Sequence, residues 1–221
     1  MSRPDLILWG LHGLRLKPFA SGDDLAEIYG VDGSDFIAVL DHLAESRWAK
    51  YRTAAPCGWI ITPAGMAHLD TLVRAELESS GFKFEIGDCY QQFIPLNSSL
   101  LELCVRWQAG NDRDPLGIGG TDSITSSTQV LIGELGLLNE RAQPLCVELG
   151  LLLSRYAHYA NRLSYAFNQV VDGAHEWFTG ATIASYHTVW FELHTDLLAT
   201  LGLDRATETA KANSSRISDP A

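Results

Sequence analysis

The chain has 221 residues, of which 46% are hydrophobic, and its formal net charge is −11. This hydrophobic fraction is enough to bury a core, which excludes wholesale disorder and allows one large domain or two small ones. The acidic balance does not exclude DNA binding, but it requires a local basic patch, because neutralised phosphates supply most non-specific affinity for DNA.

The sequence offers no membrane span and no leader pattern. Its most apolar run, residues 133–153, is interrupted by charged residues and a proline, so we expect buried helix surface there. We therefore expect a soluble cytoplasmic protein with no membrane partner. No two cysteines form a C-x-x-C pair, which predicts reduced and mostly buried thiols at Cys57, Cys89, Cys104 and Cys146.

The first predicted elements are two helices and a turn. Apolar residues at helical spacing predict a helix over residues 6–16, which Pro18 prevents from continuing. Ser21 and the acidic residues after it are typical of an N-cap and first turn for a short helix over residues 25–29. That helix is expected to stop at Gly30.

A third helix is predicted over residues 35–47, with Ser34 as its cap. The turn over residues 30–33 joins it to the preceding helix, and two short helices joined in this way indicate a helix-turn-helix. The inward face of the third helix is expected to be Phe36, Val39, Leu40 and Leu43.

A β-hairpin and a fourth helix follow. Residues 48–52 and 58–61 are predicted strands, with a tip over residues 53–56. Thr62 then caps a helix to about residue 79, with Pro63 at the first helical position, where its missing N–H is tolerated. The order helix, helix, helix, hairpin, helix predicts a winged helix-turn-helix domain over residues 1–80.

The junction between hairpin and fourth helix carries a family resemblance. Its sequence is Gly58-Trp59-Ile60-Ile61-Thr62-Pro63-Ala64-Gly65, and it resembles the W-x-L-T-P-x-G junction of MarR-like regulators. The resemblance covers about a third of the chain. It implies a winged helix-turn-helix fold, and fold alone does not assign a function.

The exposed face of the third helix is acidic by prediction, whereas basic residues lie at its end and on the wing. In a helix-turn-helix reader this face meets DNA, but carboxylates repel phosphate and nothing there makes the bidentate guanine contact of arginine. The expected exposed positions are Asp35, Ala38, Asp41, His42 and Glu45. The candidate DNA contacts are Arg47, Lys50, Arg52 and His42; the alternatives are ordinary solvated charges, or a protein partner at the acidic face.

The rest of the chain is predicted to be helical, so the expected fold class is mainly α with a small β-hairpin wing. We predict a helical ligand-sensing or assembly domain over residues 81–204, a homodimer formed through its helices, and a disordered tail over residues 205–221. A turn-rich loop is expected over residues 108–122. The predicted helices are 86–107 (interrupted near Pro95), 123–138, 142–153, 156–171 and 185–201.

We predict neither a cofactor nor a metal site, and no catalytic residues. The run Gly117-Ile118-Gly119-Gly120-Thr121 lacks the lysine of a phosphate-binding P-loop and follows no clear strand. His187 and His194 are seven residues apart, about 10 Å along a helix, so one metal ion cannot bind both.

Aromatic and histidine residues in the C-terminal part favour a small-molecule pocket, with a wall of core aromatics as the alternative. The candidate pocket residues are Trp107, Trp177, Tyr186, His187, Trp190 and His194.

A second resemblance rests on residues 11–17, on Trp107-Gln108 with Asn111-Asp112, and on residues 186–194. These stretches are similar to a little-characterised group of actinobacterial proteins labelled MarR-like. The winged-helix part is also similar to segments that accompany pyruvate phosphate dikinase-like, phosphoenolpyruvate-utilising enzymes, although the phosphohistidine signature of those enzymes is absent.

Two functional hypotheses follow. The first is a DNA-binding transcriptional regulator with a helical sensing or dimerisation domain. The alternative, implied by the second resemblance, is a non-catalytic accessory subunit that docks a phosphoenolpyruvate-utilising or pyruvate phosphate dikinase-like phosphotransferase. Independent catalysis is the least favoured.

Overall fold

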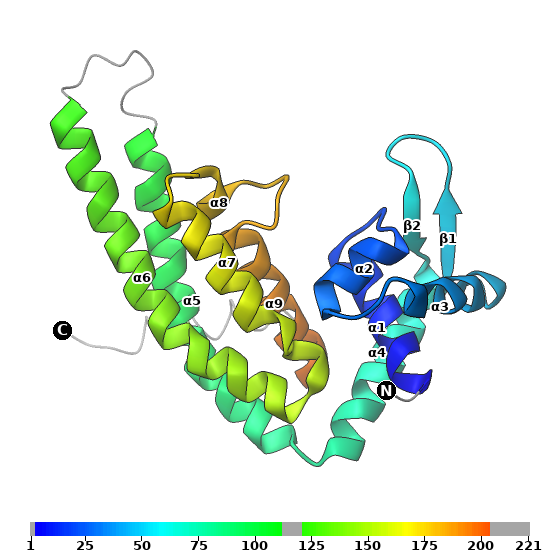
Figure 1. Ribbon diagram of the computed structural model, residues 1–221. Helices are drawn as coiled ribbons and strands as arrows, with labels where there is room; N and C mark the ends of the chain where they lie inside the picture. The colour runs from blue at the N-terminus through cyan, green and yellow to red at the C-terminus, as the bar shows by residue number, and fades with distance from the viewer. Residues whose placement is uncertain (1–2, 112–120, 204–221) are drawn as a thin grey trace. The chain divides into compact units, whose positions relative to one another are not determined.

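The computed structural model describes residues 3–111 and 121–203, with side chains for residues 6–109 and 127–203. The described chain is mainly helical with a two-stranded antiparallel sheet, which confirms the predicted fold class (Figure 1). It forms two compact units: residues 3–83 together with 195–203, and residues 84–194. The predicted domain boundaries stay predictions, and the predicted tail lies outside the described residues.

Four helices and a hairpin make up most of the first unit. Ser21 and Asp24 cap the second helix reciprocally, as the sequence indicates. The predicted cap of the third helix is wrong: Ser34 is its first helical residue, because the Ser34 N–H already donates to the Asp32 carboxylate at 2.9 Å, and the cap position is Gly33. The helices are α1 (Arg3–Leu16), α2 (Gly22–Tyr29), α3 (Ser34–Glu45) and α4 (Pro63–Ser80).

The wing consists of β1 (Ala49–Arg52) and β2 (Gly58–Ile61), paired antiparallel with Ala49 opposite Ile61 and Arg52 opposite Gly58. Ala20 extends this sheet by a single bridge to Trp59, whose N–H donates to the Ala20 carbonyl at 2.9 Å. The segment before α2 therefore pairs with β2 at Trp59, next to the end of the strand that leads to the wing tip.

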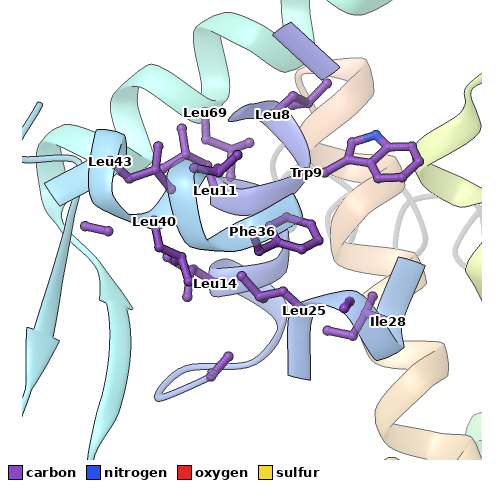
Figure 2. Packing of buried hydrophobic residues seen from close by; sticks show 14 of the residues in the cluster. Leu8, Trp9, Leu11, Leu14, Leu25, Ile28, Phe36, Leu40, Leu43 and Leu69 are labelled. Atoms are coloured by element: carbon purple, nitrogen blue, oxygen red, sulfur yellow. The ribbon is translucent and has the colours of Figure 1, made fainter. Parts of the chain in front are cut away.

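The core of the first unit lies between α1, α2, α3 and α4 (Figure 2). The predicted inward face of α3 is confirmed, since Phe36, Val39, Leu40 and Leu43 are all buried. Figure 2 shows Phe36 and Leu40 among the leucines of α1, which are buried by the same contacts. This apolar cluster fixes the orientation of α3 against α1.

The second unit contains longer helices than the sequence suggests. Two sequence predictions are wrong: Pro95 does not interrupt α5, and residues 121–152 form one helix, with Pro144 inside it, rather than two. The predicted loop also starts too early, because residues 108–111 are helical. The elements are α5 (Lys83–Asn111), α6 (Thr121–Leu152), the 3₁₀ turn η1 (Ser154–Tyr156), α7 (His158–Val171), the short helix α8 (Glu176–Thr179) and α9 (Tyr186–Leu201), whose last residues belong to the first unit.

Packing explains why the two prolines are tolerated. A proline inside a helix removes one backbone hydrogen bond and strains the preceding turn. Leu96 and Leu100 on α5, and Leu145 and Leu149 on α6, are nearly fully buried around those positions. Burial of these side chains offsets the loss of one hydrogen bond. A prediction made from the proline alone does not include this free energy of burial.

Across residues 3–111 and 121–203, each helix is too short or too polar to cross a membrane.

Candidate nucleic-acid interface

Thr62 joins the wing to α3 and α4. Its hydroxyl donates to the Arg47 carbonyl at 2.7 Å and accepts the Gly65 N–H at 3.0 Å, so one side chain caps α4 and holds the end of the α3 segment. A Cβ at Gly65 would lie 2.0 Å from the Trp48 carbonyl oxygen, so this position requires glycine. The Thr-Pro-Ala-Gly sequence thus sets where the wing leaves the helices.

Arg47 occupies an unusual backbone position at the end of α3. Its φ is +59°, in the left-handed region that favours glycine. The Arg47 N–H donates to Ala44 and the Trp48 N–H donates to Leu43, at 3.0 and 2.8 Å, which is the hydrogen-bond pattern of a Schellman motif. The arginine side chain is exposed where α3 turns into the wing.

Two more cations lie on β1. Lys50 and Arg52 are both exposed, and Tyr51 between them is 53% exposed with its ring edge-on to Trp59. The Arg52 guanidinium lies 5.4 Å from the centre of the Phe19 ring, a cation–π distance that restrains the side chain. Exposed cations beside an exposed aromatic ring are suited to contact with phosphate and sugar.

The outer face of α3 is acidic, as the sequence indicates. All five predicted positions are exposed, and α3 contains no lysine or arginine. Ile37 is also 62% exposed on this helix. The carboxylates of Asp35, Asp41 and Glu45 would repel phosphate, so α3 is poorly suited to lie deep in the major groove.

His42 lies where the acidic face meets the wing. Its ring is edge-on to Trp48, with ring centres 5.9 Å apart, and Trp48 stacks on His68 at 3.7 Å. Burial lowers the pKa of His68, which favours the neutral form of that ring. His42 therefore sits against an aromatic pair in the first unit.

Three of the predicted pocket residues come together in the second unit. Trp190 stacks on Phe93 at 4.8 Å, and its indole N–H donates to Asn97 at 3.1 Å. Tyr186 stacks on Trp190 at 6.1 Å, and the His194 ring lies 5.1 Å from that of Phe93. Trp190 and Tyr186 are almost fully buried, as core aromatics are.

The other three predicted pocket residues have different neighbours. Trp107 packs edge-on against Phe178 at 4.9 Å, whereas Trp177 packs edge-on against Tyr165 at 5.2 Å. His187 is half-buried, and burial lowers its pKa. The ring contacts in these two groups identify the candidate pocket residues other than His187 as packing residues. The ligand pocket stays a prediction.

A buried polar cluster in the first unit is not predicted from the sequence. His12 lies with Nε2 2.8 Å from the Asp196 carboxylate and Nδ1 2.5 Å from the Tyr29 hydroxyl, and Arg15 donates to Asp196 at 2.6 Å. His12 and Asp196 are fully buried, so the cluster offers no access to a substrate. Since 184 residues separate the two, local patterning gives no signal that pairs them.

Among the residues whose placement is described, no three histidine, cysteine or acidic side chains are grouped so that they could hold a metal ion. The glycine-rich run that begins at Gly117 lies, up to residue 120, outside that set. No protein-family model, curated protein or solved structure matches this chain.

Proposed function

We propose that the chain is a winged-helix DNA-binding regulator that grips duplex DNA chiefly through its wing. The observation that carries the proposal is the placement of Arg47, Lys50 and Arg52. All three are exposed at the base of the wing or along β1, while the outer face of α3 has carboxylates instead. The resemblance of the Trp59–Gly65 junction to MarR-like regulators supports the same class of protein.

The charge distribution sets the expected mode of binding. Lysine and arginine on a wing can contact phosphates or the minor groove, and such contacts position a protein without specifying sequence. Because α3 has no side chain for bidentate guanine recognition, we expect modest sequence preference and a strong dependence of affinity on salt. Each phosphate contact contributes a slope of about 0.9 to the plot of log affinity against log salt.

A fluorescence-anisotropy titration tests the proposal. The full-length protein is titrated into duplexes from its own gene neighbourhood and into an unrelated duplex of equal length, at low and at physiological salt. We expect binding that weakens as salt rises. A folded protein that binds no duplex at either salt contradicts the proposal.

A charge variant tests whether α3 lies close to the duplex. Neutralising Asp41 and Glu45 together, as Asp41→Asn with Glu45→Gln, removes repulsion and is expected to strengthen binding. The matched control is Glu78→Gln, because Glu78 is exposed near the far end of α4 and more than 20 Å from Thr62 by the helical rise of ~1.5 Å per residue. Equal affinities in the α3 variant and the control would place the duplex away from α3.

One observation favours a second candidate, an accessory subunit that docks a protein. Ile37 is 62% exposed on the same helix as Asp41 and Glu45, and an exposed apolar side chain with charged residues on the same face is suited to a protein-docking surface. The second resemblance suggests a phosphoenolpyruvate-utilising, pyruvate phosphate dikinase-like phosphotransferase as the partner. Titration of that purified enzyme against the chain and against Ile37→Asp tests it: docking requires binding that the substitution weakens at least tenfold.

A further inference from the structure

Phe19 lies in the turn between α1 and α2 with a backbone conformation that phenylalanine rarely adopts. Its φ is +66°, in the left-handed region, where a residue with a bulky side chain is strained. Phe19 follows Pro18, and a turn in which a residue at positive φ follows proline usually has glycine or asparagine at that residue. Strained residues of this kind cluster at functional sites, since glycine would relieve the strain wherever the side chain is dispensable.

Backbone contacts hold Phe19 beside the wing. The Phe19 N–H donates to the Trp59 carbonyl at 2.9 Å, and the Trp59 N–H donates to the Ala20 carbonyl at 2.9 Å. A Cβ at Gly58 would lie 2.0 Å from the Phe19 carbonyl oxygen, and the φ of Gly58 is +142°. Glycine at residue 58 therefore leaves the space in which residue 19 approaches β2.

The ring of Phe19 meets one of the wing cations. Arg52 pairs with Gly58 across the hairpin, which brings it to the same end of the wing as Phe19. The carbon of its guanidinium lies over the Phe19 ring, 5.4 Å from the ring centre, and cation–π attraction acts within about 6 Å. Among the described residues of the first unit, the apolar core and the side chains packed against it do not include Phe19, which is half-buried. The contact with Arg52 thus accounts for the ring better than core packing does.

We propose that Phe19 is a positioning residue whose ring holds the Arg52 guanidinium in place for contact with a DNA phosphate. The inference rests on the proposed function, because that function assigns Arg52 to DNA. A ring face holds a guanidinium without occupying its N–H groups, which lie in the plane of the group and can bind phosphate oxygens in pairs. A carboxylate in the same place would occupy those groups and repel the phosphate.

The other contact of the guanidinium is weak. Nη2 of Arg52 donates to the Ala55 carbonyl at 3.4 Å, which is long for a hydrogen bond, so a phosphate can displace it. A long side chain loses rotamer freedom when it contacts phosphate, and the ring has already removed part of that freedom from Arg52. Loss of the ring is expected to weaken DNA binding about two- to fivefold, the factor that corresponds to an exposed cation–π contact.

Nuclear magnetic resonance of the full chain without DNA tests the positioning itself. Protons over the face of an aromatic ring resonate upfield, so the Hδ protons of Arg52 should be shifted upfield in the wild type. They should return to ordinary values in Phe19→Leu, which keeps an apolar side chain and the backbone strain but has no ring. Phe19→Tyr keeps a ring face and should keep the shift. Ordinary Arg52 shifts in the wild type overturn the proposal.

A double-mutant cycle tests the consequence for DNA binding. Wild type, Phe19→Leu, Arg52→Gln and the double variant are titrated into one duplex by fluorescence anisotropy. We expect Phe19→Leu to weaken binding about two- to fivefold in the wild-type background and to have no further effect once Arg52 is replaced. Phe19→Tyr should bind as the wild type does. The matched control is Phe82→Leu, the same change at a 38% exposed ring beyond the end of α4, which should leave the affinity unchanged.

The outcomes separate this inference from the proposed function. A wild type that binds no duplex contradicts the proposed function, while the Arg52 shifts still decide whether Phe19 positions that residue. Phe19→Gly removes the ring and relieves the backbone strain, so it provides a second folded variant without the ring and should lose affinity by the same factor. Variants without the ring that bind as tightly as the wild type, or that lose the same factor with and without Arg52, overturn the proposal.

Discussion

The Thr62 hydroxyl donates to the carbonyl of Arg47 across 2.7 Å, and this contact joins the cap of α4 to the first cation of the wing. Arg47 also ends α3 through a Schellman motif, so its backbone is held from both sides. The wing cations are therefore presented from a fixed base, which reduces the entropy that they would lose on contact with phosphate.

Two substitutions of Arg47 separate the effect of its charge on DNA binding from the effect of its backbone conformation on stability. Arg47→Gly and Arg47→Ala remove the same charge, but only glycine adopts a φ of +59° without strain. We expect Arg47→Gly to be about 1 kcal/mol more stable than Arg47→Ala in urea denaturation, while both lose DNA affinity to the same extent. If DNA affinity instead falls further in the less stable of the two variants, Arg47 affects binding by stabilising the fold and not through its charge.

Gly65 and Gly87 form a matched pair of helical glycines. A Cβ at Gly65 would lie 2.0 Å from the Trp48 carbonyl oxygen, whereas one at Gly87 in α5 would meet no atom within 4 Å. Gly65→Ala should therefore lower the free energy of unfolding by about 2 kcal/mol or more. Gly87→Ala should raise it by about 0.5–1 kcal/mol, because alanine is the better helix former. A Gly65→Ala variant with the same free energy of unfolding as the wild type would contradict the close approach of Gly65 to the Trp48 carbonyl oxygen.

Asp24 gives the first unit a pH-dependent contribution to stability. Partial burial raises the pKa of its carboxyl, but hydrogen bonds from Lys17 and Ser21 outweigh this and bring the pKa from 3.8 to about 2. Because the folded pKa lies below the unfolded one, the contribution is full above pH 3.8 and is lost as pH falls towards 2. We expect about 0.5–1 kcal/mol after screening, since the carboxyl is 32% exposed.

Urea denaturation of the wild type and Asp24→Asn as a function of pH measures that contribution. The difference between the two should be largest at neutral pH and should shrink as pH falls from about 4 to about 2. A difference that stays constant with pH would mean that the charge of Asp24 is not the stabilising feature.

Asp196 is expected to matter for stability although it lies near the end of α9. Its carboxylate is fully buried between His12 and Arg15. Asp196→Ala removes the buried carboxylate that both side chains contact and should cost about 3 kcal/mol or more, whereas Asp196→Asn, which keeps an acceptor oxygen, should cost less. Thermal denaturation of the two variants checks the order, and equal stability to wild type would show that the cluster is dispensable.

The order of three helices, a hairpin and a fourth helix in the first 80 residues was predictable because its signals are local. The Ser21–Asp24 cap and the Thr62-Pro63 helix start each depend on residues within one turn of each other. Their hydrogen bonds form between near neighbours, so the residue types alone carry the information. The same is true of the acidic outer face of α3, which follows from helical period.

The parts that were missed or wrong depend on distant packing. Pro95 and Pro144 look like helix ends in isolation, but buried leucines around them keep α5 and α6 continuous. His12 and Asp196 meet only because the chain folds back over 184 residues. The apolar run over residues 133–153, predicted to be buried helix surface, is buried on one face only: Leu135 and Leu149 are buried, whereas Leu137 and Leu151 are exposed. An apolar run does not show which of its faces the rest of the unit covers.

The most direct test of the central claim is the salt dependence of DNA binding with and without the wing cations. The variant in which Arg47→Gly, Lys50→Gln and Arg52→Gln are combined is titrated into a duplex by fluorescence anisotropy over a range of salt concentrations, beside the wild type. The account predicts weaker binding and a slope of log affinity against log salt that falls by up to ~3, about 0.9 per lost phosphate contact. An unchanged affinity and slope in a folded variant would contradict it.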